Sequence, residues 1–334
     1  MSSGTSMIPD LRSWDDIKEL GWNTLLLGNG FSINISNLFS YSSLYWESVV
    51  QLGPSGKIFD GLGTTNFEEV LEALLHTELV VSALGADSTK IQNLYTQVRH
   101  ALFDTIKRVH VPWCDIPNGT LSAVATALRS YDRVFTTNYD LLPYWSLVEA
   151  APFGFADLFL DVGNAFNPRN TEIFSGKTGL YFLHGAVHLW QDDSTGATGK
   201  WTSGLNSLLE RLETVYTSES LRRPLFVSEG NSEKKLRTIR RSDYLAFALE
   251  ELRRDSSATV VFGHSLGSSD VHIAEALADG TRQRFAVSVR PGPHGPSPAY
   301  MGHVLEALRG HEVYFFDSRT HPLGSPSLTV PTTP

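Results

Sequence analysis

Four short apolar segments of this chain each run directly into a cluster of small, polar or ionisable residues. A packed core does not require Gly, Asn, Asp, His or Ser at such positions. In an open α/β sheet, ligands bind in the crevice outside the carboxyl ends of the strands, so we expect these clusters to meet in one site. Segments 24–27, 133–136, 180–183 and 259–262 lead respectively into Gly28-Asn29-Gly30-Phe31-Ser32, Thr137-Asn138-Tyr139-Asp140, His184-Gly185 and Gly263-His264-Ser265-Leu266.

The first cluster, residues 28–32, has the composition of a strand-to-helix turn that binds phosphate. Glycines in such a turn let backbone N–H groups approach a diphosphate at a helix N-terminus, although a plain tight turn would carry the same glycines. A hydride-transfer enzyme would have a third glycine, where this chain has Ile33, and an acidic residue about 20 residues further on. The pattern therefore argues against an ordinary dehydrogenase.

The second and third clusters hold the candidate catalytic side chains. Asn138 and Asp140 place an amide and a carboxylate two residues apart beyond a buried strand; an Asx-turn that caps the next helix accounts for only one of them. His184 ends another strand, and Gly185 leaves its imidazole open to a ligand. A lone histidine beside apolar residues is more often structural, but this position favours catalysis. His184 and His188 form a His-x-x-x-His pair, but the second position has no glutamate and the local pattern is that of a strand. A zinc protease is therefore disfavoured.

The fourth cluster offers a competing hypothesis, a serine esterase. Residues 263–267 match the G-x-S-x-G nucleophile elbow of α/β-hydrolases, with Ser265 as the nucleophile. That fold needs an acid and then a histidine on separate loops after the serine. Asp317 and His321 are the available pair, and they are only four residues apart. The spacing disfavours the hydrolase.

Length, composition and charge exclude several classes of protein. The chain has 334 residues, of which 41% are hydrophobic and 19% charged, as in ordinary globular proteins. A net charge of -9 provides no global basic field for nucleic acid or an anionic membrane. Cys114 is the only cysteine, which excludes a four-cysteine zinc site. There is no secretory signal and no apolar run near the roughly 20 residues that span a bilayer. We expect a cytoplasmic protein without direct nucleic-acid or membrane binding.

Alternating helical and strand patterns predict the fold class. Apolar residues recur at helical spacing over 67–75 and 91–106, which predicts a helical insertion at residues 55–117. We expect an α/β fold with a doubly wound, mainly parallel, Rossmann-like sheet, formed by residues 20–54 and 118–320. Residues 322–334 are expected to be a disordered tail. Further helices are expected at 15–20, 120–128, 141–149, 205–215 and 233–252, with strands at 224–227, 285–289 and 312–316; the basic face at 234–241 is expected to be solvated or to dock an acidic partner.

Taken in chain order, the clusters resemble the motifs of the sirtuin (SIR2) nucleotide-binding domain, and more closely its SIR2-like NAD-hydrolysing branch. The resemblance spans residues 22–316 and also extends to a bacterial family related to SIR2, in which Thr-Thr-Asn-Tyr-Asp, His-Gly-Ala and Gly-His-Ser-Leu recur. Residues 28–32 resemble the Gly-Ala-Gly-hydrophobic-Ser loop, 137–140 the Gln-Asn-Ile-Asp motif, 184–185 the catalytic His-Gly, Phe226-Val227-Ser228-Glu229 the Phe-Phe-Gly-Glu motif, and 263–266 the Gly-Thr-Ser-Leu motif.

The departures from the sirtuin pattern decide what the resemblance implies. Sirtuin deacylases hold a structural zinc with four cysteines, which this chain lacks, and Thr137 replaces the sirtuin glutamine. The resemblance therefore implies an NAD⁺ glycohydrolase without zinc rather than a deacylase. Members of that branch often serve as effectors of bacterial anti-phage defence and stay inactive until a partner or ligand signals infection. A regulatory partner protein, a homo-oligomer or both are thus implied.

The resemblance also assigns roles to individual residues. Asn138 would bind the ribose and position water, His184 would act as general base, and Asp140 would orient the ribose or the Asn138 loop. An ADP-ribosyl cyclase and a non-catalytic sensor of NAD or ADP-ribose remain open alternatives. Residues expected to bind the dinucleotide are Gly28, Asn29, Gly30, Phe31 and Ser32 at the diphosphate, Gly263, His264, Ser265, Leu266 and Asp270 at the adenosine side, and Thr137, Ser228 and Glu229.

Overall fold

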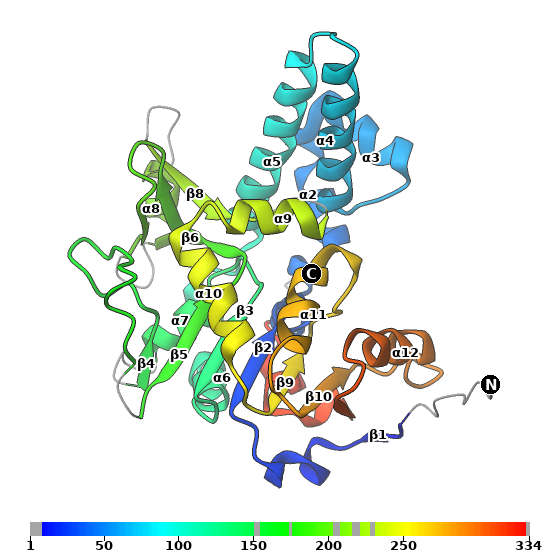
Figure 1. Cartoon of the computed structure of the whole chain (residues 1–334), viewed down its shortest axis with the longest axis vertical. Helices are drawn as coiled ribbons and strands as arrows, with labels where there is room; N and C mark the ends of the chain where they lie inside the picture. Colours follow the sequence, from blue (N-terminus) through cyan, green and yellow to red (C-terminus); the bar gives the residue numbers. More distant parts are fainter. Residues whose placement is uncertain are drawn as a thin grey trace.

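A parallel β-sheet forms the centre of the computed structural model, which describes residues 9–149, 154–173, 176–202, 208–215, 221–227 and 231–331 (Figure 1). Among these residues the sheet has eight strands, and every neighbouring pair is parallel. Across the sheet the order is β1 (Leu11–Arg12), β11 (Glu312–Asp317), β10 (Arg284–Val289), β9 (Thr259–Phe262), β2 (Thr24–Leu27), β3 (Arg133–Thr136), β5 (Thr178–Phe182) and β4 (Phe155–Ala156).

Helices cover both faces of this sheet, and its central strands are buried between them. Every residue of β2, β5 and β9 is buried, as expected for parallel strands packed on both sides. On one face lie α10 (Asp243–Arg254), α11 (Val271–Ala278) and α12 (Pro298–Ala307), and α6 (Thr120–Leu128) packs against α7 (Leu142–Glu149) on the other. The predicted doubly wound, mainly parallel α/β fold is confirmed.

The order of the strands reverses between β2 and β9. From β2 the chain proceeds through β3 to β5 on one side, and from β9 through β10 to β11 on the other. Such a reversal opens a crevice at the carboxyl ends of the two strands where it occurs. Leu27 and Phe262 end β2 and β9 in register, so the clusters at 28–32 and 263–266 leave the sheet side by side.

A helical insertion separates β2 from β3 and projects beyond the carboxyl edge of the sheet (Figure 1). After α1 (Asn29–Ile35) come α2 (Tyr41–Leu52), α3 (Gly56–Leu62), α4 (Phe67–Ala83) and α5 (Thr89–Val109). The helices begin at residue 41, earlier than the predicted boundary at 55, because α2 packs against α5. Phe67, Val70 and Leu71 bury the apolar stripe of α4 that the periodicity predicted.

A smaller antiparallel sheet follows His184. Its order is β7 (Thr198–Lys200), β6 (Gly185–Asp192) and β8 (Arg222–Phe226). The predicted strand at 224–227 therefore joins this sheet and not the parallel one. Beside it lie α8 (Leu208–Val215) and α9 (Ser232–Ile239); the helix expected over 233–252 is divided, because Ser242 caps α10 by accepting a hydrogen bond from the Leu245 amide.

The carboxyl-terminal segment corrects a prediction from the sequence. Residues 322–331 are not a disordered tail, since they form the short turns η10 (Pro322–Gly324) and η11 (Pro326–Leu328) against the molecule. Leu323 is fully buried, and the Val330 amide donates to the Ile35 carbonyl at 2.8 Å. Buried apolar side chains and satisfied amides are what order a polar, Pro-rich segment. Residues 332–334 lie outside the described part of the chain.

Short 3-10 helices complete the described structure, and two of them replace the helix expected at 15–20. Over the described ranges, no helix combines the length and the apolar character needed to cross a membrane. The remaining short helices are η1 (Trp14–Asp16), η2 (Lys18–Leu20), η3 (Asn37–Phe39), η4 (Gly53–Ser55), η5 (Trp113–Asp115), η8 (Ser268–Asp270) and η9 (Ser318–Thr320).

Candidate functional site

Two adjoining cavities open at the strand reversal. The first has a volume of about 250 Å³ and lies between the strand ends and the helical insertion. The second, of about 220 Å³, continues toward β10 and the carboxyl-terminal segment. They share Gly30, Gly263, His264 and Ser265 in their walls. Two connected compartments of this size suit a ligand made of two linked halves.

A directional chain of hydrogen bonds orients Asn138 in the first cavity. Ser32 Oγ donates to Asp140 Oδ2 at 2.6 Å, so this hydroxyl is left to accept, and Asn138 Nδ2 donates to it at 2.7 Å. The amide orientation follows from that order, and Asn138 Oδ1 is buried without a hydrogen-bond partner among the residues that the structure describes. An unsatisfied buried acceptor costs free energy unless a ligand supplies a donor. The arrangement is ready to receive a hydroxyl group.

Asp140 anchors this chain from a buried position. Its Oδ1 accepts from the Leu142 amide at 2.8 Å, which starts α7 and leaves both carboxylate oxygens occupied. Burial raises the pKa of Asp140 to about 6, against the smaller lowering effect of the Ser32 hydrogen bond. The Asx-turn expected as a structural role is therefore present, and the same carboxylate also orients Ser32 and Asn138.

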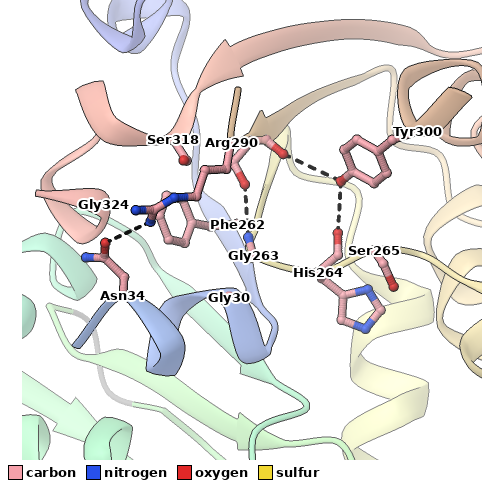
Figure 2. Close-up of a pocket in the computed structure, with 11 residues that line it drawn as sticks. Gly30, Asn34, Phe262, Gly263, His264, Ser265, Arg290, Tyr300, Ser318 and Gly324 are labelled. Carbon is pink, nitrogen blue, oxygen red and sulfur yellow. Dashed lines mark hydrogen bonds between the residues drawn. The ribbon is translucent and has the colours of Figure 1, made fainter. Parts of the chain in front are cut away.

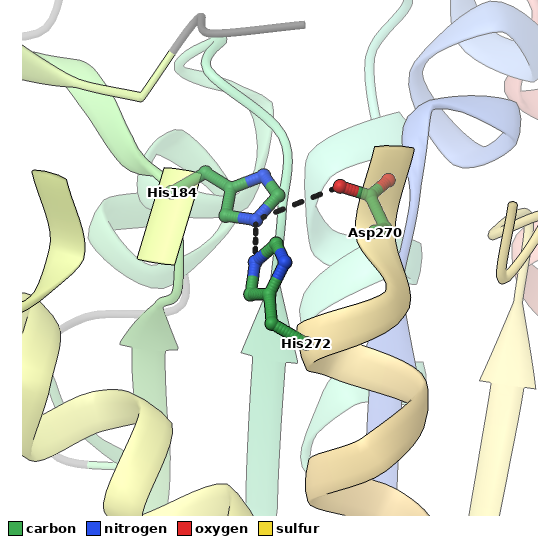
Figure 3. Close-up of side chains that lie close together, drawn as sticks. All are labelled: His184, Asp270 and His272. Carbon is green, nitrogen blue, oxygen red and sulfur yellow. Dashed lines mark hydrogen bonds and ion pairs between the residues drawn. The ribbon is translucent and has the colours of Figure 1, made fainter. Parts of the chain in front are cut away.

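His184 faces a second histidine and a carboxylate (Figure 3). Its Nε2 lies 2.9 Å from His272 Nε2 and 3.8 Å from Asp270 Oδ1. A hydrogen bond between two imidazole nitrogens needs one donor and one acceptor, so the pair shares one proton at this contact. Burial holds the pKa of His184 well below its usual value and lowers that of His272 to about 4. Both rings are neutral at pH 7, as a general base must be.

The same three side chains could be considered for a metal ion, since their ligand atoms lie within 4.8 Å of one another. Their other contacts argue against it. The ammonium group of Lys235 lies 2.8 Å from Asp270 Oδ1, and a cation already placed there opposes a second one. The 2.9 Å separation of the imidazole nitrogens is that of a hydrogen bond. The contacts of His184, His272 and Asp270 with one another and with Lys235 are therefore those of a hydrogen-bonded cluster.

The second cavity is lined by polar groups from β10 and α12 (Figure 2). Arg290 carries an exposed guanidinium whose Nη1 donates to Asn34 Oδ1 at 3.3 Å. Tyr300 donates its hydroxyl to the His264 carbonyl at 3.1 Å, and Ser288 Oγ accepts from the Gly263 amide at 2.9 Å. This compartment therefore offers one cation and several hydroxyl groups.

The glycines of the first and fourth clusters serve a different purpose from the one expected. The Gly30 amide donates to the Gly263 carbonyl at 2.9 Å, so it is not free to bind phosphate. A Cβ on Gly30 would lie 2.7 Å from Gly263 Cα, and one on Gly28 would lie 2.5 Å from His264 Cα. Both glycines are needed because the loops after β2 and β9 touch each other.

The structure brings most of the predicted site residues together. Phe31 and Leu266 instead bury their side chains in the core, Ser32 acts from beneath the cavity, and Gly28 packs against the neighbouring loop. Asp270 was expected at the adenosine side but lies beside His184. Ser228 and Glu229 lie outside the described residues. The predicted residues that line the cavities are Asn29, Gly30, Thr137, Asn138, Asp140, His184, Gly263, His264, Ser265 and Asp270.

Sequence reasoning missed several polar residues of the site. The sequence pattern accounts for Glu68 as an acidic residue in the first turn of a helix, yet its side chain is buried in the wall of the first cavity. His272 follows Asp270 by two residues, a spacing that could have drawn attention to it. Arg290 and Tyr300 lie in a loop and helix after β10 and carry no sequence signal that links them to the site.

The geometry does not assemble a serine hydrolase. Within the described residues, His321 is buried against Tyr131, whose hydroxyl lies 3.1 Å from its Nε2, and Asp317 pairs with Arg319. Neither side chain is available to Ser265. The strained left-handed conformation falls on Leu266, with φ 50°, and not on the serine that a nucleophile elbow places there.

A parallel sheet with a strand reversal, and a polar two-part crevice at that point, define a doubly wound α/β protein with a candidate ligand site at the position usual for this fold. Residues 25–323 match the family described as a domain of unknown function (DUF4917), and the chain belongs to this family. No curated protein matches it.

The solved structures that are similar to this chain include two of Sir2 proteins. The first is described as the structural basis for the mechanism and regulation of Sir2 enzymes. It is 12% identical, with a TM-score of 0.37 over 88% of this chain and 98% of that one. The second is a mutant Sir2 homologue in complex with 2'-O-acetyl ADP ribose. It is 14% identical, with a TM-score of 0.35 over 86% of this chain and 91% of that one.

Proposed function

We propose that this protein is an NAD⁺ glycohydrolase, which splits the bond between nicotinamide and ribose. The observation that carries the proposal is the buried Asn138 Oδ1, which has no hydrogen-bond partner among the described residues and belongs to a residue that lines the same cavity as the neutral His184. An acceptor for a ribose hydroxyl and a general base beside it are the groups that this cleavage needs. The sequence motifs named above support the same assignment.

Cleavage of this bond passes through an oxocarbenium-like state, as in glycoside hydrolysis. Nicotinamide leaves from a positively charged ring, so no general acid has to protonate it. In this proposal Asn138 holds a hydroxyl of the ribose, and His184 takes a proton from a ribose hydroxyl or from the attacking water. General-base catalysis of this kind contributes typically about 10²–10⁴-fold. Asp140 acts through Ser32, by fixing the orientation of the Asn138 amide.

The two cavities suit the two halves of the dinucleotide. The nicotinamide ribose would occupy the first, beside His184, and the adenosine the second, beside Tyr300. Arg290 is then the candidate for the diphosphate, because it carries the guanidinium in the wall of the second cavity and its charge suits a phosphate oxygen. The glycine loop places these compartments next to each other instead of binding the phosphates through the Gly30 amide.

The test is to incubate the purified protein with NAD⁺ and identify the products. Nicotinamide and ADP-ribose are expected, and replacing Asn138 by Ala should lower kcat at least about 100-fold. Asn170→Ala is the matched control, since Asn170 is exposed and its side chain bonds only Asp161 in the described structure. Cyclic ADP-ribose would establish the cyclase alternative. Binding of NAD⁺ without release of nicotinamide would make the protein a sensor and overturn the proposal.

We further propose that the activity is regulated by a partner or by self-association, as in anti-phage effectors. The support is apolar surface on the insertion, where Trp46 is 70%, Val50 91% and Leu84 78% exposed. A rate per molecule that rises with protein concentration, or on addition of proteins encoded by neighbouring genes, is expected in the same assay. High and concentration-independent turnover by the lone monomer would contradict regulation while leaving the glycohydrolase intact.

A further inference from the structure

One lysine of the basic segment 234–241 is not on the surface. The Lys235 side chain is 1% exposed, although the sequence pattern placed it on a solvated helix face. Its Nζ lies 3.0 Å from Glu68 Oε2 and 2.8 Å from Asp270 Oδ1. Glu68 and Asp270 line the first cavity, whereas Lys235 lies behind them. The lysine therefore belongs to the support of the site and does not contact its ligand.

The two carboxylates keep this lysine charged despite its burial. A lone buried ammonium would lose its proton, but Glu68 and Asp270 together raise the pKa of Lys235. In return, the Lys235 ammonium group helps to hold the pKa of Asp270 low against the raising effect of burial. Burial raises the pKa of Glu68, the more enclosed carboxyl group. The three groups form an interdependent buried cluster.

Lys235 and His184 share one oxygen of Asp270. Oδ1 accepts from Lys235 Nζ at 2.8 Å and lies 3.8 Å from His184 Nε2, while Oδ2 faces His264 Nε2 at 3.6 Å. A carboxylate close to an imidazole stabilises the imidazolium and so favours protonation. The ammonium group partly neutralises Asp270 and repels a proton on His184 directly. Both effects keep the histidine in its basic form.

The helical insertion holds this lysine in place. Glu68 and Glu72 lie one turn apart on α4, and both contact the first turn of α9 or its cap. Glu68 pairs with Lys235, and Glu72 Oε1 accepts from Asn231 Nδ2 at 2.7 Å. Asn231 caps α9 by accepting a hydrogen bond from the Lys234 amide. Docking of α4 on α9 therefore sets the position of the ammonium group.

We propose that Lys235 is a positioning residue that holds Asp270 in a paired state and thereby keeps His184 a neutral base, and that Glu68 of the insertion holds Lys235 there. As a statement about the reaction, this rests on the proposed function. The protonation of His184 can be measured without any reaction. The titratable groups that face the cluster come from several elements. They are Glu68 from α4 of the insertion, Tyr139 from the loop after β3, Lys235 from α9, Asp270 from η8, His272 from α11, and His184 and His264 from the ends of β5 and β9.

The experiment follows the ring nitrogens of His184 by NMR in ¹⁵N-histidine-labelled full-length protein over a pH titration, with the signal assigned from His184→Gln. Lys235→Met should raise the pKa of His184 by about one unit or more, because Asp270 loses its partner. Lys235→Arg keeps the positive charge, so the pKa of His184 should stay close to its wild-type value. The double variant Glu68→Gln with Lys235→Met removes one charge of each sign. It should also raise the pKa of His184. Because Glu68 is replaced together with its partner, only Asp270 remains as an unpaired buried carboxylate, so this variant provides the test if Lys235→Met does not fold.

Arg237→Met is the matched control, because Arg237 is an exposed cation on the same helix and pairs only with Glu233 in the described structure. It should leave the titration of His184 unchanged. If the protein cleaves NAD⁺, the pH at which kcat falls on acidification should move upward in the double variant by the same amount as the pKa of His184, since deprotonation restores the base. An unshifted His184 in the folded double variant would overturn the proposal. Absence of NAD⁺ cleavage would overturn the proposed function and leave the titration result standing.

Discussion

At the scale of single residues, the site is built around one orphaned acceptor. In the described part of the chain the Asn138 amide oxygen has no hydrogen-bond partner, and the orientation of the amide follows from Ser32 and Asp140. His184 supplies a neutral imidazole because its surroundings exclude water. None of these properties belongs to one residue alone. Each depends on a neighbour from a distant part of the chain.

Asp140 provides a test at this scale, since its pKa is about 6 in the folded protein and 3.8 in the reference state. A carboxyl group with a raised pKa stabilises the fold at low pH, and this contribution is lost as the pH rises from about 4 through 6. The loss amounts to roughly 3 kcal/mol. In Asp140→Asn this dependence should be missing.

The measurement is urea unfolding of both proteins at pH 4.5, 5.5, 6.5 and 7.5, with the difference between their unfolding free energies plotted against pH. The wild type should lose stability relative to Asp140→Asn across this range. A difference that stays constant with pH would show that Asp140 is ionised throughout and that burial does not govern its pKa.

At the scale of elements, two strand-end loops make the crevice by touching each other. Gly263 has φ 68°, and a Cβ there would lie 2.6 Å from the Phe31 amide nitrogen. The Gly30 amide bonds the carbonyl of the same glycine. The loop after β9 therefore fixes the loop after β2, and the two cavities share this contact as their common wall.

Replacing Gly263 by Ala should separate these loops. A left-handed backbone and the close contact together should destabilise the fold by about 1–3 kcal/mol, and NAD⁺ should bind at least about tenfold more weakly. Thermal unfolding and calorimetric titration measure the two effects. Gly302→Ala is the control, because Gly302 lies inside α12 with open space around it. That exchange should stabilise the protein by about 0.5–1 kcal/mol; equal effects of the two substitutions would refute the steric argument.

At the scale of the whole molecule, both the insertion and the carboxyl-terminal segment complete the site. The insertion contributes Phe67, Glu68, Leu102 and Ile106 to the first cavity. The carboxyl-terminal segment holds α1 from the opposite side, since Asn34 Nδ2 donates to the Leu323 and Ser325 carbonyls, each at 3.2 Å. A central sheet with open strand ends becomes a closed site only when these parts pack on it.

Deleting residues 322–334 should therefore destabilise the protein. Leu323, Leu328 and Val330 are buried, and each apolar side chain of this kind contributes about 1.5–3 kcal/mol. We expect a fall of several kcal/mol in unfolding free energy and weaker NAD⁺ binding. A chain that ends at residue 331 keeps all of these contacts and is the control. If the protein that lacks residues 322–334 were as stable as the full-length chain, this segment would be a dispensable tail after all.

Much of the fold was predictable because local pattern and strand burial agree. The strands that end near residues 27, 136, 182 and 262 are short, apolar runs, and each is followed by residues that favour a turn. Alternation with amphipathic helices then leaves a parallel, doubly wound sheet as the consistent arrangement. The start of the insertion was placed too late, because α2 belongs to it through packing on α5, which no local pattern reveals. The break between α9 and α10 depends on a single capping serine.

The sequence by itself determined which strand ends present polar residues to the crevice, because polar residues directly after buried strands are visible in the residue order. It could not determine which partners those residues meet. Lys235 has the local pattern of an exposed cation, yet packing of α4 and α9 buries it between two carboxylates. Arg290 and Tyr300 enter the second cavity only through the order of strands across the sheet. Periodicity reports the face that a residue shares with its own helix or strand, whereas burial and charge depend on segments far away in the chain, which only tertiary packing brings together.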